Sequence, residues 1–382
     1  MSIDRCSVIK YPTSWGFRRE PSRPVELRLD DRHTGASFDE MFDWDNIWHD
    51  AFQINPNIII LIGPPLLNTR EYIEKNCAFV SDSGEILKAK CIDMDRVGYT
   101  IIQVSGWKNE LTMHPGAVTI KISKYDSIFT DQHTIITGQK DNPISWIRGW
   151  ISYHRDIHCI KHFLIYNNNS TIYSIEQLDE SLTDLGVTVK LVEWDVPHGP
   201  FGVDFGGGNW VWDSDFSYPT MLEHAKRKYL TGARSASNLF PDELLLLKDG
   251  NLDNIVDCML QEGVAGYRFN GPWIEPYDIV NNISADKIPF EDRKYIDYYC
   301  TDSNNLQSLV TKYIVIPRLA MDGQWGPHSV NAPMRHNNDI SYGHFLAMNT
   351  NWSWKRDEYT RDPINLKVLE TLKSNLSKVN WQ

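Results

Sequence analysis

The architecture of this chain can be read most directly from residues 133–170, which run HTIITGQKDNPISWIRGWISYHRDIHCIKHFLIYNNNS. The β-branched run His133–Gly138 ends in glycine and predicts a strand. Lys161–Tyr166 predicts a second strand, closed by polar residues. The segment between them, Asn142–His154, spaces its apolar residues as one helical face does, at Ile144, Ile147, Trp150 and Ile151. Strand, helix and strand in this order predict an α/β sheet.

The alternation continues towards the C-terminus. The same patterns predict helices over 174–185, 219–229 and 253–261, and strands over 187–194, 235–239, 264–269 and 313–317. We therefore predict an α/β domain over 131–350. A leucine stripe over Pro363–Val379 predicts an amphipathic helix, which makes 351–382 a C-terminal helical segment.

The first third of the chain has a different pattern. Residues 1–50 are polar and rich in Arg, Asp and Pro, and we expect an extended arm there. Residues 51–130 predict short strands separated by turns, such as Asn57–Leu61 and Tyr99–Ser105. Their spacing is typical of a small β-sandwich, so we expect a β-rich domain over 51–130.

Composition and charge exclude several classes of function. The 382 residues carry 38 basic and 50 acidic side chains, a formal charge of -12. A protein that wraps nucleic acid normally presents a basic field, so we expect no nucleic-acid partner. No apolar run approaches the roughly 20 residues of a membrane span, so we expect any membrane association to be peripheral.

The N-terminal sequence and the cysteines predict a cytoplasmic protein. The first 30 residues carry charges throughout and show no apolar secretory segment. Six cysteines are scattered without a CxxC pair, which favours reduced thiols.

Polar residues follow three of the predicted strands at their carboxyl ends. These segments are 137–141 (TGQKD), 167–170 (NNNS) and 238–243 (NLFPDE). In an open α/β sheet, ligands bind at this edge. Amide and lysine side chains could bind a nucleotide there, and the carboxylates of Asp242 and Glu243 could hold a divalent cation. Each segment by itself could also be a polar turn or a helix cap.

Residues 133–170 resemble the opening of GT-A glycosyltransferases of family 92 and related family 2 type. In that family a helix reading roughly EWIxYHxxxG precedes a strand reading HFxIYDNxS, and about 70 residues later comes a segment like LNxDxDEL. This chain matches the three motifs at Trp150, Tyr153, His154, His162, Phe163, Ile165, Tyr166, Asn168, Ser170, Asn238, Asp242, Glu243 and Leu244. A weaker likeness continues through 312–318 and 342–345, so the resemblance covers about 133–350.

The resemblance implies a Rossmann-like GT-A domain with a mixed sheet, preceded by a small β-rich domain. It implies transfer of a sugar from a nucleotide-sugar donor to a hydroxyl of a glycan acceptor, such as capsule or lipopolysaccharide, with inversion. In the family the second Asp of the DxD motif, here Asp242, contacts a Mn²⁺ or Mg²⁺ that bridges the donor diphosphate. A late histidine completes the metal site, for which we choose His344 first and His328 second. The donor-binding residues expected on this basis are Gly138, Lys140, Asp141, Asn167, Asn168, Asn169, Asn238 and Arg318.

Several positions depart from the family pattern. Phe240 stands where the DxD motif has its first Asp, which leaves metal dependence open. Asn167 replaces an Asp, and Lys140-Asp141 replaces an Asn-Glu pair, which puts a cation near the donor phosphates. These changes could compensate for a weaker metal site, or they could mark a noncatalytic chain. The competing interpretation is therefore a glycan-binding or scaffolding protein that kept the fold.

Remaining candidates concern the acceptor and the proton transfer. Glu275, in the segment GPWIEP, is our predicted general base, and Trp273 beside it could stack on a sugar. Residues 204–216 predict a loop near the active site, where Trp212 could contact the acceptor. Each of these residues could also have a structural role. Glu275 could be a surface glutamate beside a buried Trp273, and His344 could be a core histidine. Arg318 could form a surface ion pair, and residues 204–216 could be a simple connecting loop.

Hydrolase chemistry is not favoured by the sequence. The nucleophile-elbow motif GxSxG and the zinc motif HExxH are both absent.

Overall fold

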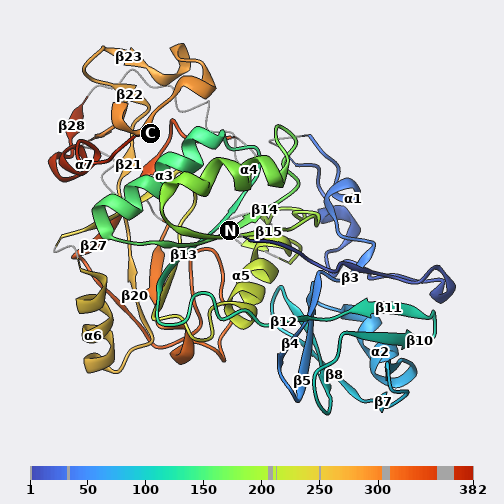
Figure 1. Cartoon of the computed structure of the whole chain (residues 1–382). Helices are drawn as coiled ribbons and strands as arrows, with labels where there is room; N and C mark the ends of the chain where they lie inside the picture. Colours follow the sequence, from blue (N-terminus) through green and yellow to red (C-terminus); the bar gives the residue numbers. More distant parts are fainter. Residues whose placement is uncertain are drawn as a thin grey trace.

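A computed structural model describes residues 2–31, 35–204, 210–211, 213–248, 251–302, 310–350 and 365–381. An eight-stranded mixed sheet with helices on both faces forms its centre (Figure 1). In spatial order its strands are β1 (Ser2–Arg5), β15 (Thr188–Glu193), β14 (His162–Asn167), β13 (His133–Gln139), β18 (Ser235–Asn238), β25 (Lys312–Val315), β20 (Gly266–Phe269) and β26 (Met334–His336). The α/β class and the large mixed sheet expected from the sequence are confirmed, and the sheet is compatible with a Rossmann-like fold.

Strand direction defines the functional edge of this sheet. β1, β15, β14, β13 and β18 are parallel, and β25 runs antiparallel to both of its neighbours, β18 and β20. From β13 the chain builds β14 and β15 on one side and then returns to add β18 on the other. The sheet therefore has a topological switch point between β13 and β18, the place where α/β sheets open a ligand crevice.

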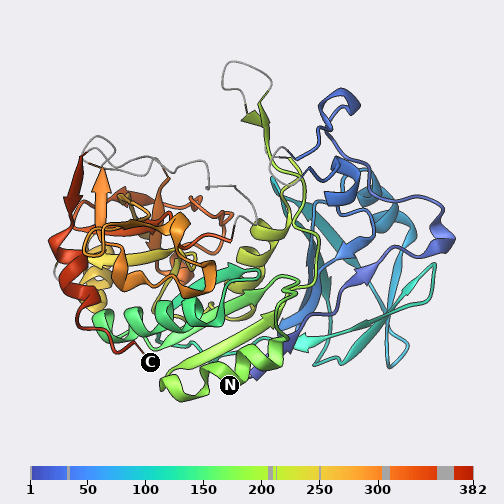
Figure 2. The same cartoon turned by 90° about the horizontal axis from the view of Figure 1, so that it is seen from above.

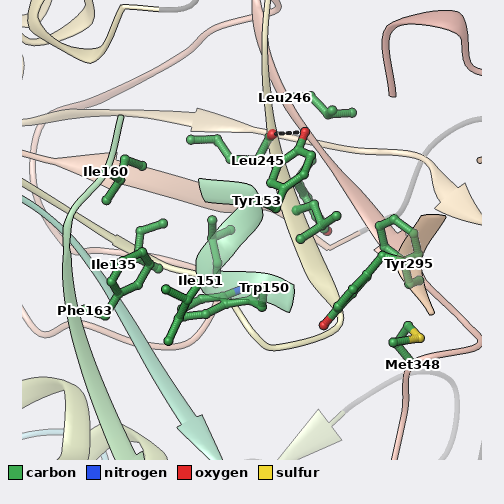
Figure 3. Packing of buried hydrophobic residues seen from close by; sticks show 14 of the residues in the cluster. Ile135, Trp150, Ile151, Tyr153, Ile160, Phe163, Leu245, Leu246, Tyr295 and Met348 are labelled. Carbon is green, nitrogen blue, oxygen red and sulfur yellow. Dashed lines mark hydrogen bonds between the residues drawn. The ribbon is translucent and has the colours of Figure 1, made fainter. Parts of the chain in front are cut away.

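Alternation along the central strands sorts their side chains onto two faces. Ile135, Phe163 and Ile165 belong to one buried cluster, while Ile136 and Leu164 belong to another. In the first cluster Trp150 and Ile151 lie beside Ile135 and Phe163, and the Tyr153 hydroxyl donates to the Leu245 carbonyl at 3.0 Å (Figure 3). This packing explains the helical stripe seen in the sequence.

Helices cover both faces of the sheet. The first face carries α3 (Ile144–His158), α4 (Ile175–Leu182) and α6 (Leu252–Glu262), and the second carries α5 (Ser217–Lys228). A capping box between Ser174 and Gln177 starts α4 at the residue that the sequence indicated. Across the described ranges, every helix is too short or too polar to span a bilayer.

Two smaller sheets form what we call the N-terminal β unit, residues 50–124. One contains β12 (Ser123–Lys124), β4 (Asp50–Asn55), β5 (Ile58–Gly63), β9 (Gly98–Gln103) and β8 (Ala89–Asp93). The other contains β11 (Val118–Lys121), β10 (Glu110–His114), β6 (Ala78–Ser81) and β7 (Ile86–Leu87). The helix α2 (Arg70–Asn76) joins them, and the unit lies beside the α5 side of the large sheet (Figure 2).

Several other elements are short. They are α1 (Phe38–Met41), β2 (Ile9–Lys10) with β3 (Asn46–Trp48), β16 (Val203–Asp204) with β17 (Trp210–Val211), and β22 (Tyr277–Asp278) with β23 (Ile283–Ser284).

Both chain ends differ from what their local patterns predict. Ser2–Arg5 lies within the expected arm but forms β1, an edge strand that pairs with β15. The C-terminal stripe forms β28 (Leu366–Val368) and then α7 (Glu370–Leu376), so the helix is shorter than predicted. The reason is that β28 pairs with β24 (Cys300–Asp302), and this long-range ladder outweighs the local helical pattern.

A buried polar cluster joins the β unit to α5. Lys228 Nζ lies 2.9 Å from a carboxylate oxygen of Asp50 and 2.9 Å from one of Asp4. His224 lies 2.9 Å from Asp50 through Nε2 and 2.8 Å from the Tyr166 hydroxyl through Nδ1. Burial alone would raise the pKa of Asp50, but the charge of Lys228 and the hydrogen bond from His224 lower it well below its ordinary value. Asp50 is therefore held as a carboxylate at the junction.

We expect Asp50→Asn to lower the free energy of unfolding at pH 7 by about 3 kcal/mol, because it breaks a buried ion pair. The pKa of Asp50 is lower in the folded state than its unfolded value of about 3.9, so this stabilisation is present above that pH and is lost as the pH falls through the folded-state pKa. Urea unfolding of both proteins at pH 7 and under acid should show the difference shrink in acid. The control is Asp45→Asn, which removes an exposed pair with Arg18. Equal effects of the two substitutions would contradict the interpretation.

Candidate functional site

The three polar segments predicted at strand ends lie side by side. β13 pairs in parallel with β14, with Gln139 opposite Asn167, and with β18, with Ile136 opposite Asn238. Segments 137–141, 167–170 and 238–243 therefore leave the same edge of the sheet at the switch point. Because β25 is antiparallel, its first residue, Lys312, lies at this edge too, opposite Phe269 at the end of β20.

Amides after β13 and β14 hydrogen-bond mainly to one another. Gln139 Nε2 donates to Asn167 Oδ1 and to Ser170 Oγ, and Ser170 Oγ donates to Asn167 Oδ1 at 2.6 Å. The Tyr173 hydroxyl donates to Gln139 Oε1 at 3.0 Å. Gln139 and Asn167 are buried, so this network shapes the strand ends and leaves them little capacity for a ligand.

Other predicted donor-binding residues also make structural contacts. Asn168 Nδ2 donates to the carbonyls of Trp194 and Val196, at 2.7 and 3.0 Å, and Asn169 Nδ2 donates to the latter at 3.2 Å. Asp141 accepts from the backbone N–H of Thr171. These side chains hold the loops that follow β13, β14 and β15.

Of the two remaining predicted donor-binding residues in the first segment, Lys140 is suited to ligand contact and Gly138 is packed within the protein. The half-buried Lys140 side chain makes no hydrogen bond or ion pair with a described residue, so its ammonium group is available to an anion. Gly138 is closely packed: its N–H donates to the Tyr218 hydroxyl at 3.2 Å, and a Cβ there would lie 2.9 Å from Met221 Sδ. Gly138 therefore allows the end of β13 to pack closely against α5.

Carboxylates and an imidazole gather in a three-stranded sheet beside this edge. β19 (Glu243–Leu247) pairs with β27 (Ile340–Phe345), which places Glu243 opposite His344. His344 Nε2 lies 3.3 Å from Asp242 Oδ2, and its Nδ1 lies 3.9 Å from Glu243 Oε1. One ligand atom from each of Asp242, Glu243 and His344 lies within 4.8 Å of the others. We call these three residues the Asp242 cluster.

Aromatic stacking holds the imidazole of this cluster. β21 (Trp273–Ile274) pairs with β27 so that Trp273 lies beside His344. Their ring centroids are 4.1 Å apart at 23°, so the indole orients the imidazole plane. Trp273 was predicted to contact the acceptor. In the structure, one face of its ring stacks on His344. Glu275, two residues after Trp273, is half-buried, and its backbone N–H donates to the carbonyl of Cys300.

Lys312 is a site residue that the sequence analysis missed. Its Nζ lies 2.8 Å from Glu243 Oε2, and both side chains are fully buried. The same Nζ lies 3.7 Å from the centroid of the Phe240 ring, and the backbone N–H of Phe240 donates to Glu243 Oε2 at 2.7 Å. Phe240 therefore covers a fixed cation at the position where the family motif has a carboxylate.

The structure places Arg318 away from the other predicted donor-binding residues. Arg318 follows the end of β25, whose Val315 lies opposite Ala236 near the start of β18. The antiparallel direction of β25 therefore puts the exposed Arg318 at the opposite edge of the sheet from Lys312. The run KYIVIPR showed a strand with a cation at each end, but strand direction could not be read from it.

His328 and Asn238 lie next to Phe240. The His328 ring is 6.2 Å from the Phe240 ring, and burial, followed by the charges of Lys312 and His344, lowers the pKa of His328 well below its ordinary value. Asn238 Nδ2 donates to the carbonyl of Pro327 at 3.0 Å, while its buried Oδ1 has no hydrogen-bond partner among the described residues. His328 is thus a neutral neighbour of the Asp242 cluster rather than a member of it. Trp212, predicted as an acceptor contact, lies outside the described residues.

The donor set of the Asp242 cluster suits a divalent ion. Asp242 Oδ2 and His344 Nε2 could bind one ion together, since carboxylate and imidazole are both ligands of such metals. Glu243 would then stand behind His344 on the Nδ1 side, as outer carboxylates commonly do at metal-bound histidines.

Comparisons with known proteins found distant structural similarities. No family model matches the chain, and no curated protein matches its sequence. HddC from Yersinia pseudotuberculosis is similar in structure with 9% identity and a TM-score of 0.32, over 58% of this chain and 96% of that one. The mannosyltransferase Ktr4p from S. cerevisiae is similar with 11% identity and a TM-score of 0.28, over 56% and 70%. Likenesses this distant carry no argument about function, which must come from the site.

We expect Lys312→Met to lower the free energy of unfolding by about 3–5 kcal/mol, because it leaves Glu243 as a buried carboxylate without its cation. The double variant Lys312→Met/Glu243→Gln should be more stable than Lys312→Met alone. Denaturant unfolding of the set measures both effects, and Lys248→Met, at an exposed pair with Asp339, is the control. A double variant that loses the sum of the two single losses would show that the pair is not coupled.

Proposed function

We propose that this protein is a glycosyltransferase that moves a sugar from a nucleotide-sugar donor to a hydroxyl of a glycan acceptor. The observation that carries the proposal is the position of the Asp242 cluster. Asp242 and Glu243 follow the turn after β18, so the cluster lies beside the switch point between β13 and β18. Nucleotide ligands of α/β sheets bind at such a crevice.

The donor diphosphate is proposed to lie against the Asp242 cluster. Asp242 and His344 would hold Mn²⁺ or Mg²⁺ there, and the ion would neutralise the charge that develops on the leaving diphosphate. Lys140, at the end of β13, supplies a further positive charge to the same edge. The buried Oδ1 of Asn238 is an acceptor suited to a hydroxyl of the donor.

Glu275 is proposed as the general base. It lies one residue beyond β21, whose Trp273 stacks on His344, and so it belongs to the strand next to the Asp242 cluster. As the acceptor oxygen bonds to the anomeric carbon, the bond from that carbon to the diphosphate oxygen breaks. The diphosphate leaves with the electron pair, and Glu275 takes the hydroxyl proton. Attack from the face opposite the leaving group inverts the anomeric carbon.

The acceptor is proposed to be a surface polysaccharide such as capsule or lipopolysaccharide, modified in the cytoplasm by a peripherally associated enzyme. A noncatalytic glycan-binding protein is the second candidate. Two observations favour it: Phe240 removes a carboxylate from the motif, and the amides after β13 and β14 bind one another.

The test of the proposed function is a panel of nucleotide-sugars assayed for released nucleoside diphosphate, with and without Mn²⁺. We expect Asp242→Asn to lower kcat/KM by about 10²–10³-fold with the fold retained, because it removes charge stabilisation at the leaving group. Asp339→Asn, at an exposed ion pair, is the matched control. Absence of both turnover and binding with every donor would favour the glycan-binding candidate.

Glu275→Gln separates proton transfer from donor binding. We expect kcat to fall about 10²–10⁴-fold while the Kd of the donor stays unchanged, because only the base is lost. Steady-state kinetics and donor titration measure the two quantities, with the exposed Glu291→Gln as control. A normal kcat in Glu275→Gln would assign the base to another residue.

A further inference from the structure

A turn of the N-terminal β unit reaches the edge of the candidate site. Residues 94–97 connect β8 to β9, and the Met94 N–H donates to the Val97 carbonyl at 2.8 Å. At the tip of the turn, the Asp95 N–H donates to Gln324 Oε1 at 3.1 Å. Gln324 begins the segment 324–328, which ends at His328. The β unit therefore contacts the segment that lies next to Phe240.

This segment is fastened to the site from the other side as well. Asn238 Nδ2 donates to the Pro327 carbonyl, and Thr311 Oγ1 donates to the His328 carbonyl at 2.7 Å. Thr311 directly precedes Lys312. The turn of the β unit is thus separated from the buried cation of the site by one short, anchored segment.

Arg96 extends from this turn towards Asp215. Its side chain is 14% exposed, and its Nη1 lies 3.3 Å from Asp215 Oδ2. Its Nε is buried and makes no hydrogen bond within the described part of the chain, although it lies 3.4 Å from Asp95 Oδ2. A guanidinium has five N–H donors, so the ion pairs with Asp215 and Asp95 leave part of its hydrogen-bonding capacity unused.

The charge of Arg96 acts on the same histidine as the cations of the site. Burial is the largest cause of the low pKa of His328, and Lys312, His344 and Arg96 lower it further. The positive charges of Arg96 from the β unit and of Lys312 from the large sheet therefore both act at the position of His328. An anion beside His328 would be attracted by both, and the Phe240 side chain that covers Lys312 carries no negative charge.

We propose that Arg96 contacts the diphosphate of the donor, so that the N-terminal β unit completes the donor site. The inference rests on the proposed function. Its chemical basis is that a guanidinium binds phosphate oxygens through two parallel hydrogen bonds. In a site with one carboxylate fewer than the family motif, a fixed cation supplies part of the positive charge that the diphosphate needs.

The opposing interpretation is that Arg96 only joins the β unit to Asp215, and a pair of variants separates the two. Arg96→Gln should raise the Kd of UDP or GDP by about 10- to 100-fold, the size of a charge-assisted hydrogen bond, and leave the Kd of uridine or guanosine unchanged. Asp215→Asn should leave the diphosphate Kd unchanged or lower it, because it releases the guanidinium. Calorimetric titration measures each Kd, and thermal unfolding checks that each variant is folded.

The controls make each outcome decisive. Arg18→Gln, which breaks an exposed pair with Asp45 near the β unit, should bind as the wild type does, and Arg96→Lys should lie between the wild type and Arg96→Gln. If Arg96→Gln and Asp215→Asn change the Kd equally, or not at all, the proposal is overturned while the proposed function stands. A wild-type protein that binds none of the nucleoside diphosphates of the donor panel overturns both.

Discussion

The candidate site depends on the buried ion pair between Glu243 and Lys312. A carboxylate and an ammonium group without solvent contact are tolerated only when each stays close to the other and is hydrogen-bonded. The Glu243 side chain also accepts from the Phe240 backbone, and its carbonyl accepts from Trp150 Nε1 at 3.0 Å. The pair therefore joins β25, the turn after β18 and the main helix α3. Asp242 and His344 take their positions from this framework, since both flank Glu243 in the chain or in the ladder.

The helix α5 connects this site to the N-terminal β unit. One part of it carries His224, which hydrogen-bonds to Asp50 of the β unit, and Lys228, whose ammonium group pairs with the same carboxylate. At its start, the Tyr218 hydroxyl contacts Gly138, and the Tyr218 ring lies 5.1 Å from the Phe240 ring. The β unit is thus attached through buried polar contacts to the element that lines the switch point. Buried charges are costly to separate, so this junction favours one fixed arrangement of the two parts. A fixed arrangement is also what a residue donated from the β unit to the site would require.

Site residues were predictable in type and region but less so in role. The carboxylates after β18 and the late histidine could be found because a short motif carried them, and they lie together. The asparagines after β14 had the same polar character, yet Asn168 binds the backbone of the neighbouring loop. Composition does not show whether an amide side chain binds a ligand or hydrogen-bonds within its own chain. Arg318 and Lys312 stand at opposite ends of one predicted strand, and only the strand's direction in the sheet shows which of them reaches the site.

The sequence by itself determined the α/β class and most of the individual helices and strands, because apolar periodicity and capping are local. The stripe over 142–154 became α3, and Ser174 became the cap of α4. Tertiary structure alone decided the antiparallel direction of β25, the edge strand formed by Ser2–Arg5 and the pairing of β28 with β24. It also decided that Lys312 lies under Phe240 and that the β unit touches the segment next to His328. These features join residues far apart in the chain, and their stability comes from buried ion pairs and strand pairing that no local pattern records.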